Sequence, residues 1–270
     1  METRICVAGV TGWVGRALVP AILEADDLRL AAAVSRSAAG SDVGEALGLD
    51  GLGVKVSRSV DDALDTECDV LVDYTAPDAV KANVLTSIGR GVHAVVGTSG
   101  LGADDYAEID RHARAAGVGV VAAGNFSLLA ALLQHAALLA ARHVAHWEVV
   151  DYASAAKPDV PSGTARELAE RLGQVRDAEL GRTLDELHGP VEARGARVGG
   201  TQVHSLRLPS FVVSTEAIFA LPDERLSLRH DTGSSADPYV GGTLLAARVA
   251  GTRIGVTRGL DTLLFGESVS

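Results

Sequence analysis

The chain has 270 residues, of which 47% are hydrophobic and 22% charged, a balance typical of a well-buried globular protein. A net charge of −11 and a pI of about 5.1 argue against a nucleic-acid partner, because nucleic-acid binders need a basic surface. No apolar stretch approaches the roughly 20 residues that span a bilayer, and the first residues lack the layout of a signal peptide. We therefore expect a cytoplasmic protein without a membrane partner.

The cysteine and histidine positions do not suggest a metal site. Cys6 and Cys68 lie in apolar, strand-like runs, so we expect buried free thiols rather than a disulfide. His143 and His146 form a pair without further ligand residues at a suitable spacing. We predict that the protein binds no metal.

Short apolar runs alternate with helical patterns through the first half of the chain. The runs, rich in valine and alanine, are residues 4–8, 28–34, 70–74, 94–97 and 118–122. The helical patterns are residues 14–25, 78–90 and 103–116. Continuous apolar runs are typical of buried parallel strands, so this half predicts an α/β fold with a Rossmann-like, doubly wound parallel sheet.

The pattern changes after Asn125. A long apolar helix is expected over 128–142, then a strand over 147–152, and strand alternation over 201–208, 211–221 and 225–230. A last helix is expected over 241–249. We predict a dinucleotide-binding domain over 1–125, completed by 240–270, and an α+β domain with a mixed sheet over 126–239 for substrate binding and oligomerisation.

A glycine-rich turn follows the first predicted strand, in the sequence VAGVTGWVGRAL. Gly9 permits a tight turn, Gly12 lets the backbone approach a pyrophosphate, and Gly15 permits close packing of helix on strand. This turn predicts dinucleotide binding through Gly9, Thr11, Gly12, Trp13 and Val14.

The ends of the later strands add to the predicted cofactor site, because ligands of open parallel sheets lie outside the carboxyl ends of the strands. Ser35 and Arg36 follow the second strand, where an acidic residue would favour NAD; a serine and an arginine suit a 2′-phosphate instead. We predict NADPH, with NADH as the alternative. Further cofactor contacts are expected from Tyr74, Thr75, Gly97, Thr98, Ser99, Asn125 and Phe126.

A second candidate site lies in KPDVPSGTARELAERLG, residues 157–173. Ser162 or Thr164 can cap the following helix, and Gly163 permits close approach of the backbone. Because a helix N-terminus attracts anions, Lys157 beside it indicates a carboxylate or phosphate pocket. The alternative is an ordinary capped helix with a solvated lysine upstream.

Together these stretches resemble the dihydrodipicolinate reductase family over essentially the whole chain. The similar motifs are VAGVTGWVG, DYTAP, VGTSG, GNFS, KPDVPSGTA, GTQVHSLRLPS and RLSLRHDTGSS. The resemblance implies that Ser162, Gly163 and Thr164 hold a carboxylate of a cyclic imine, that Lys157 serves binding and proton supply, and that the protein is a homotetramer.

One departure from the family pattern concerns the proton donor. The family has two histidines upstream of the lysine, where this chain has Ala153 and Ser154. Lys157 and Tyr152 are the candidate acids in their place. We therefore expect an NAD(P)H-dependent reductase of a carboxylate-bearing cyclic imine with an altered substrate. The alternatives are the orthodox 4-hydroxy-tetrahydrodipicolinate reductase of lysine biosynthesis and a non-redox or non-catalytic nucleotide-binding homologue.

Overall fold

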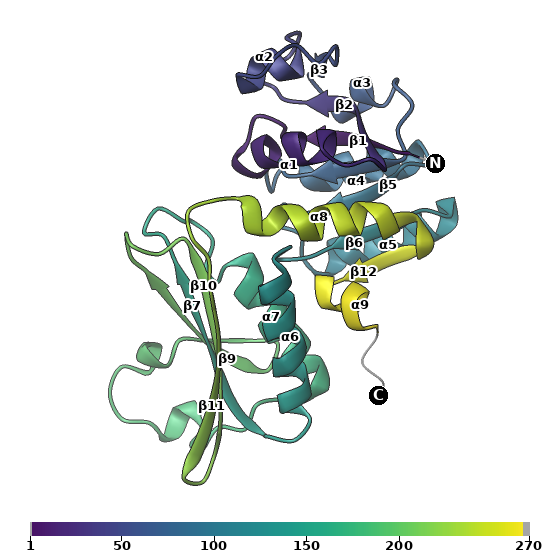
Figure 1. Ribbon diagram of the computed structural model, residues 1–270. Helices are drawn as coiled ribbons and strands as arrows, with labels where there is room; N and C mark the ends of the chain where they lie inside the picture. The colour runs from purple at the N-terminus through teal and green to yellow at the C-terminus, as the bar shows by residue number, and fades with distance from the viewer. Residues whose placement is uncertain (1, 267–270) are drawn as a thin grey trace. The chain divides into compact units, whose positions relative to one another are not determined.

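The computed structural model describes residues 2–266 and divides into two compact units (Figure 1). Unit 1 takes the chain up to Leu128 and again from Ala236, and unit 2 comprises Leu129–Ser235. The sequence placed these boundaries after residues 125 and 239. In the structure the first boundary lies three residues later, after Leu128, and the second lies four residues earlier, after Ser235, because α8 begins at Asp237 and belongs wholly to unit 1.

Unit 1 is built on a seven-stranded sheet in the order β12-β6-β5-β4-β1-β2-β3, and every strand pair is parallel. The strands are β1 (Thr3–Ala8), β2 (Leu28–Val34), β3 (Val56–Ser57), β4 (Val70–Asp73), β5 (His93–Val96), β6 (Gly119–Ala122) and β12 (Gly255–Arg258). The helices are α1 (Trp13–Leu23), α2 (Val43–Leu47), α3 (Val60–Ala63), α4 (Val80–Gly89), α5 (Ala103–Ala116), α8 (Asp237–Val249) and α9 (Leu260–Phe265), with a 3₁₀ turn at Ala250–Thr252.

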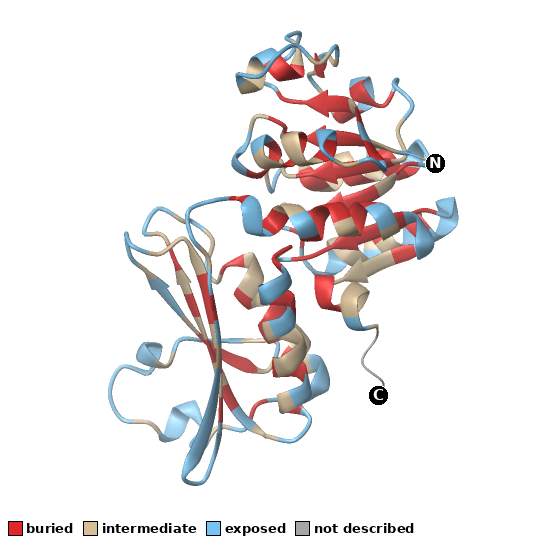
Figure 2. Cartoon of the chain, in the orientation of Figure 1, coloured by how far each residue is buried: buried red, intermediate tan, exposed pale blue. Residues whose placement is uncertain are grey.

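Strands β4 and β6 of unit 1 are buried along their whole length, and β1 and β5 are buried except at their first residues, as the mostly red sheet of Figure 2 shows. This burial explains their continuous apolar sequence, and the predicted doubly wound parallel sheet is confirmed. The sequence did not predict β3 or β12. Strand β3 has two residues, and β12 (GVTR) is a half-buried edge strand whose polar residues give no apolar run.

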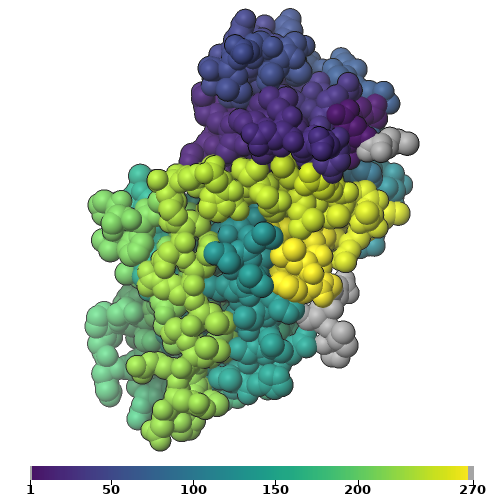
Figure 3. Space-filling model, viewed as in Figure 1, coloured from purple at the N-terminus to yellow at the C-terminus, as the bar shows by residue number. Residues whose placement is uncertain are grey.

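The C-terminal segment completes unit 1 by packing α8 against α1. The ring of Tyr239 in α8 meets the ring of Trp13 edge-on, with centroids 5.4 Å apart. In the space-filling view α8 runs along the purple N-terminal segment (Figure 3). Residues far apart in the chain therefore form one nucleotide-binding fold.

Unit 2 holds a five-stranded mixed sheet in the order β11-β10-β7-β9-β8, in which only the β7–β9 pair is parallel. The strands are β7 (His146–Ala153), β8 (Ala196–Val198), β9 (Thr201–Arg207), β10 (Val213–Leu221) and β11 (Glu224–Asp231). The helices are α6 (Leu128–Ala141) and α7 (Gly163–Val175), and 3₁₀ turns occupy Leu184–Glu186 and Val191–Arg194.

The core of unit 2 lies between one face of this sheet and the helices α6 and α7. Alternate residues of β7 are buried, and Trp147 and Val149 pack in one apolar cluster with Leu168 and Leu172 of α7 and Phe219 of β10. Strand alternation therefore assigns odd-numbered residues of β7 to the helix-covered face and even-numbered residues to the opposite face.

Replacing a buried leucine of the unit 1 sheet tests this assignment of the core. Leu71→Ala in β4 removes a fully buried side chain, and we expect it to lower the free energy of unfolding by about 2–5 kcal/mol. Leu49→Ala, at a position that is 43% exposed, is the control and should change it by less than about 1 kcal/mol. Urea unfolding followed by circular dichroism measures both, and equal midpoints would contradict the assignment.

Candidate active site

The candidate cofactor site lies where the strand order of unit 1 reverses, between β1 and β4. Gly9 follows β1 with φ of +84°, and a Cβ atom at Gly9 would lie 2.2 Å from the carbonyl oxygen of Tyr74. A Cβ at Gly15 would lie 2.3 Å from the carbonyl oxygen of Gly9. Glycine is required at both positions, because the turn after β1 approaches the end of β4 and the first turn of α1 approaches Gly9.

A cavity of about 450 Å³ opens at this edge of the sheet. Its walls come from the turn after β1, the ends of β2, β3 and β4, and the start of α4. Among the residues that the sequence assigned to cofactor binding, the lining includes Gly9, Thr11, Gly12, Ser35, Arg36, Tyr74 and Thr75.

The cavity also has lining residues that the sequence analysis did not select. Arg58 and Ser59 come from the end of β3, Ser37 extends the end of β2, and Asn83 projects from α4. A signal for Arg58 was present, because the tetrapeptide VSRS occurs at 34–37 and again at 56–59. The second copy follows no recognisable strand pattern, because β3 has two residues and no apolar run.

Three hydroxyl groups meet at one wall of the cavity. Thr11 Oγ1 lies 2.8 Å from Ser35 Oγ, and Ser35 Oγ lies 3.1 Å from Ser37 Oγ. Ser35 is buried, whereas Arg36 between the two serines is exposed. Hydroxyl groups can donate as well as accept, so this cluster can bind an anionic oxygen.

The carboxylate of Asp73, fully buried at the end of β4, organises the loops beside the cavity. Its Oδ1 accepts hydrogen bonds from the backbone N–H of Thr75 (3.0 Å), Thr75 Oγ1 (2.7 Å) and Thr98 Oγ1 (2.7 Å). Its Oδ2 accepts one from Asn83 Nδ2 (2.8 Å). Thr98 therefore holds the loop after β5 to the end of β4.

Tyr74, Gly97 and Phe126 pack together next to this network. A Cβ at Gly97 would lie 2.2 Å from the Tyr74 ring, and the Phe126 ring meets the Tyr74 ring edge-on at 6.2 Å between centroids. The Tyr74 hydroxyl lies 2.7 Å from Thr243 Oγ1 of α8, and burial raises the pKa of this phenol. The Tyr74 side chain therefore supports the strand ends.

Seven residues selected for cofactor binding do not line the cavity: Gly97, Thr98 and Phe126, described above, and Trp13, Val14, Ser99 and Asn125. Trp13 is half exposed and contacts Tyr239, whereas Val14 is buried in the first turn of α1. Ser99 is exposed in the loop after β5, and Asn125 Oδ1 accepts a hydrogen bond of 2.8 Å from the backbone N–H of Ser127.

In unit 2 the motif of residues 157–164 packs around the buried carboxylate of Asp151 in β7. Asp151 Oδ2 accepts hydrogen bonds from the backbone N–H of Ser162 (2.9 Å), Ser205 Oγ (3.0 Å) and Arg207 Nη2 (2.8 Å). Ser162 is the N-cap of α7, and its Oγ accepts from the backbone N–H of Ala165 at 3.3 Å. Of the two caps that the sequence allowed, Ser162 takes this position.

Lys157 already has an anionic partner within its own motif. Its Nζ lies 2.9 Å from Asp159 Oδ1, and both side chains are 26% exposed. Arg207 Nη2 donates to the carbonyl oxygen of Asp159 at 2.7 Å, so the same arginine ties this loop to Asp151. A substrate carboxylate at Lys157 would share the ammonium group with Asp159 or displace it.

Ala153 and Ser154, which the sequence analysis compared with two histidines of the family, both have structural roles. Ala153 is fully buried, and Ser154 Oγ accepts a hydrogen bond of 3.3 Å from the backbone N–H of Ala156 within the turn that carries Lys157. Tyr152 points to the sheet face opposite Asp151. There its hydroxyl donates to Glu216 Oε2 at 3.0 Å.

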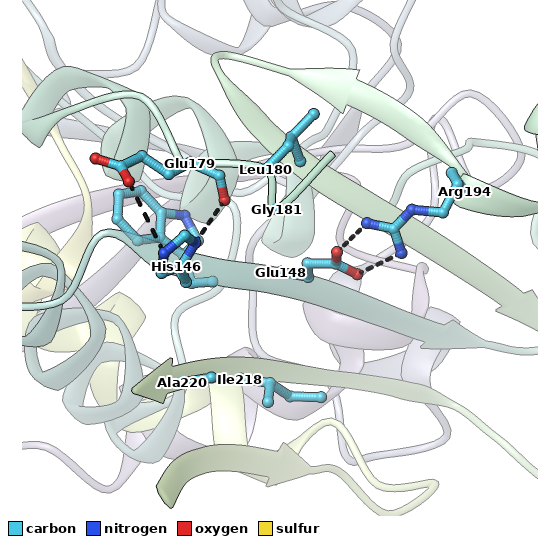
Figure 4. Close-up of a pocket in the computed structure, with 9 residues that line it drawn as sticks. His146, Glu148, Glu179, Leu180, Gly181, Arg194, Ile218 and Ala220 are labelled. Atoms are coloured by element: carbon cyan, nitrogen blue, oxygen red, sulfur yellow. Dashed lines mark hydrogen bonds and ion pairs between the residues drawn. The ribbon is translucent and has the colours of Figure 1, made fainter. Parts of the chain in front are cut away.

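A second pocket of unit 2, of about 310 Å³, is separate from this motif. In Figure 4 His146 faces Glu179 and Glu148 faces Arg194. His204 Nε2 lies 2.7 Å from Glu148 Oε2, so the charged groups of this pocket pair with one another.

Residues 2–266 contain no group of three or more His, Cys, Asp or Glu side chains placed to hold a metal ion. Within the same range, every helix is too short or too polar to cross a membrane. Cys6 and Cys68 are free thiols, the first buried and the second partly buried.

A parallel sheet with a glycine turn and a cavity at its switch point defines a nucleotide-binding protein of the Rossmann type, and comparison with known proteins makes it an oxidoreductase. Residues 3–126 match the family described as dihydrodipicolinate reductase, N-terminus, and residues 126–264 match dihydrodipicolinate reductase, C-terminus. The chain belongs to the dihydrodipicolinate reductase family.

Relatives and solved structures extend along the whole chain. The 4-hydroxy-tetrahydrodipicolinate reductases of Thermosynechococcus vestitus and Synechococcus elongatus are each 39% identical, over 96% of this chain and 96% and 98% of theirs. A dipicolinate-bound dihydrodipicolinate reductase from Paenisporosarcina sp. TG-14 has the same fold, with a TM-score of 0.77, 24% identity, and coverage of 97% of this chain and 100% of that one.

Removing the negative charge of Asp73 tests its role in the cofactor site. In Asp73→Asn an amide N–H₂ replaces one acceptor oxygen and faces a donor, so we expect unfolding to become easier by about 1–3 kcal/mol. We also expect weaker NADPH binding, because Thr75 and Thr98 lose their shared anchor. Asp78→Asn, on an exposed residue of the same loop, is the control. Urea unfolding and calorimetric titration measure both effects, and wild-type values in Asp73→Asn would refute the role.

Proposed function

We propose that this chain transfers a hydride from NADPH to a cyclic imine dicarboxylate, the reaction for which its 4-hydroxy-tetrahydrodipicolinate reductase relatives are named. The observation that carries the proposal is the placement of Lys157 in the loop that leads to the Ser162-capped N-terminus of α7. An ammonium group and a helix N-terminus both favour an anion, and a dicarboxylate offers two. The 39% identity of relatives over 96% and 98% of their length supports the choice of substrate.

Unit 1 has the residues that NADPH requires. The turn at Gly9 and Gly12 leads into the first turn of α1, whose N-terminus suits a pyrophosphate, and Arg36 offers a guanidinium for the 2′-phosphate. The cavity of about 450 Å³ lies at the strand ends where such cofactors bind. When bound, NADPH supplies the hydride.

Unit 2 would hold a carboxylate of the substrate between Lys157 and the first turn of α7, where Ser162, Gly163 and Thr164 lie. Asp151 and Arg207 anchor this loop. Asp151 accepts a hydrogen bond from the backbone N–H of Ser162, and Arg207 donates one to the carbonyl oxygen of Asp159. The Asp151 side chain is fully buried and that of Arg207 is mostly buried. Asp159 keeps the ammonium group of Lys157 at the same place before the substrate arrives.

Lys157 is the proton donor that we propose. Reduction of the imine adds a hydride and a proton, and Ala153 offers no proton where the family has a histidine. Tyr152 is the weaker candidate, because its hydroxyl already donates to Glu216 on the other face of the sheet. Burial and this bond to Glu216 also raise the pKa of Tyr152, which makes it a poorer acid.

A second candidate substrate is a different carboxylate-bearing cyclic imine, and Ala153 and Ser154 favour it. A pocket without the two histidines offers fewer hydrogen-bond donors, so it suits a substrate with one carboxylate better than a dicarboxylate. The homotetramer that the family resemblance implies and the cytoplasmic location stay predictions. Size-exclusion chromatography with light scattering tests the first.

Turnover with NADPH distinguishes the candidates. We expect the protein to reduce the lysine-pathway imine dicarboxylate at a rate typical of enzymes, roughly 1–10³ per second. The panel should include cyclic imines with a single carboxylate. Turnover of these imines without the dicarboxylate would favour the altered substrate. Binding of NADPH without turnover of any imine would favour the non-redox or non-catalytic alternative.

Substitutions of Lys157 separate binding from proton supply. Lys157→Met keeps the apolar stem without the charge, and we expect at least a 100-fold loss of turnover, the scale of a general acid being about 10²–10⁴. Lys157→Arg should retain affinity for dipicolinate, an unreactive dicarboxylate, and still lose turnover, because a guanidinium does not release its proton.

The matched control is Lys55→Met, on an exposed lysine of unit 1. NADPH affinity, measured by calorimetry, should be unchanged in all three variants, because the cofactor phosphates belong to the Gly9 turn. Full activity in Lys157→Met would refute both roles of Lys157. The motif would then be only a capped helix preceded by a lysine that pairs with Asp159.

A further inference from the structure

The cavity of unit 1 is basic in a chain that is acidic overall. Arg36 and Arg58 both line it, and none of its described lining residues is an aspartate or glutamate. The whole chain carries a net charge of −11, so a cavity with two arginines and no carboxylate differs sharply from the average surface. Local charge of this kind attracts an anionic ligand.

The two arginines reach the cavity from neighbouring strands. Strands β2 and β3 are parallel with Val34 opposite Ser57, and the backbone N–H of Ser35 donates to the carbonyl oxygen of Ser57 at 3.1 Å. Arg58 directly follows Ser57, and Arg36 lies two residues after Val34. Because adjacent strands lie about 4.8 Å apart, the two side chains begin within reach of one phosphate group.

Neither arginine has an ion pair or hydrogen bond elsewhere in the part of the chain that the structure describes. Arg90, by contrast, is held by Asp61 and Asp65. The side chains of Arg36 and Arg58 are exposed, so both can turn toward a ligand without breaking an existing contact.

The hydroxyl cluster lies on the same wall. Ser37 Oγ lies 3.1 Å from Ser35 Oγ and 3.5 Å from Thr11 Oγ1. Two guanidinium groups together with neutral hydroxyl donors suit a phosphate monoester, which has three oxygens and up to two negative charges. The ribose 2′-phosphate is the part of NADPH that has this chemistry and that NADH lacks.

We propose that Arg58 is a second 2′-phosphate ligand, which acts with Arg36 from the neighbouring strand to select NADPH over NADH. The inference rests on the proposed NADPH-dependent function and deepens it. It assigns a role to the second VSRS copy, residues 56–59, whose arginine would double the positive charge at the phosphate.

Calorimetric titration with two nucleotide fragments tests the proposal. Adenosine 2′,5′-bisphosphate and adenosine 5′-monophosphate differ only by the 2′-phosphate. The variants are Arg36→Gln, Arg58→Gln and the double variant. Arg29→Gln is the matched control, because Arg29 lies on β2 at the end away from the cavity and its substitution changes the net charge equally.

We expect Arg58→Gln to weaken binding of the bisphosphate by roughly 10- to 100-fold, the order of a lost charge-assisted hydrogen bond. The affinity for the monophosphate should stay within about twofold of the wild-type value. Arg29→Gln should change neither. An equal loss of affinity for both fragments would mean that Arg58 contacts the adenosine or the 5′-phosphate, which the fragments share, and would overturn the proposal. Wild-type affinity in Arg58→Gln would overturn it as well.

The preference of the wild-type protein for NADPH over NADH is tested separately from the role of Arg58. If the wild-type protein binds NADPH and NADH equally, the proposed NADPH dependence fails whatever Arg58 does. If Arg36→Gln alone removes the discrimination and Arg58→Gln retains it, NADPH dependence stands and the role of Arg58 is refuted.

Discussion

The carboxylate of Asp73 is the group on which the nucleotide-binding end of unit 1 depends. A buried carboxylate is stable only if hydrogen-bond donors replace the water it has lost, and Asp73 obtains them from Thr75, Asn83 and Thr98. These donors come from different segments, so one charge holds the loops after β4 and β5 and the start of α4 together. Unit 2 repeats the device with Asp151, whose donors come from β9 and the loop before α7.

Both candidate anion sites are local exceptions in an acidic chain, and they are built differently. The cavity of unit 1 has arginines without carboxylate partners, so a ligand phosphate meets charge that is already available. In unit 2 Lys157 is paired with Asp159, so a ligand carboxylate must compete with an internal one. The first arrangement lets an anion bind without breaking an internal ion pair. The second favours exchange, because Asp159 can take the ammonium group back as product leaves.

The sequence predicts most of the fold, because buried parallel strands and the glycine turn have strong local patterns. It also assigns Tyr152 and Ala153 to opposite faces by strand alternation alone. The partner of Lys157 was not predictable, since Asp159 could have pointed to solvent with the same sequence. Arg58 was not predictable for another reason: the two-residue strand β3 that precedes it has no periodicity, and only the pairing of β3 with β2 brings it to the cavity.

The closure of the unit 1 sheet by β12 has a consequence for synthesis on the ribosome. Val256 of β12 pairs with Val120 of β6, and all of unit 2 is encoded between them. Domains generally fold as units while the chain emerges, so unit 2 can reach its native state while the nucleotide-binding sheet still lacks its last strand. Until β12 has been synthesised, β6 has an unpaired edge that is open to another nascent chain or to a chaperone.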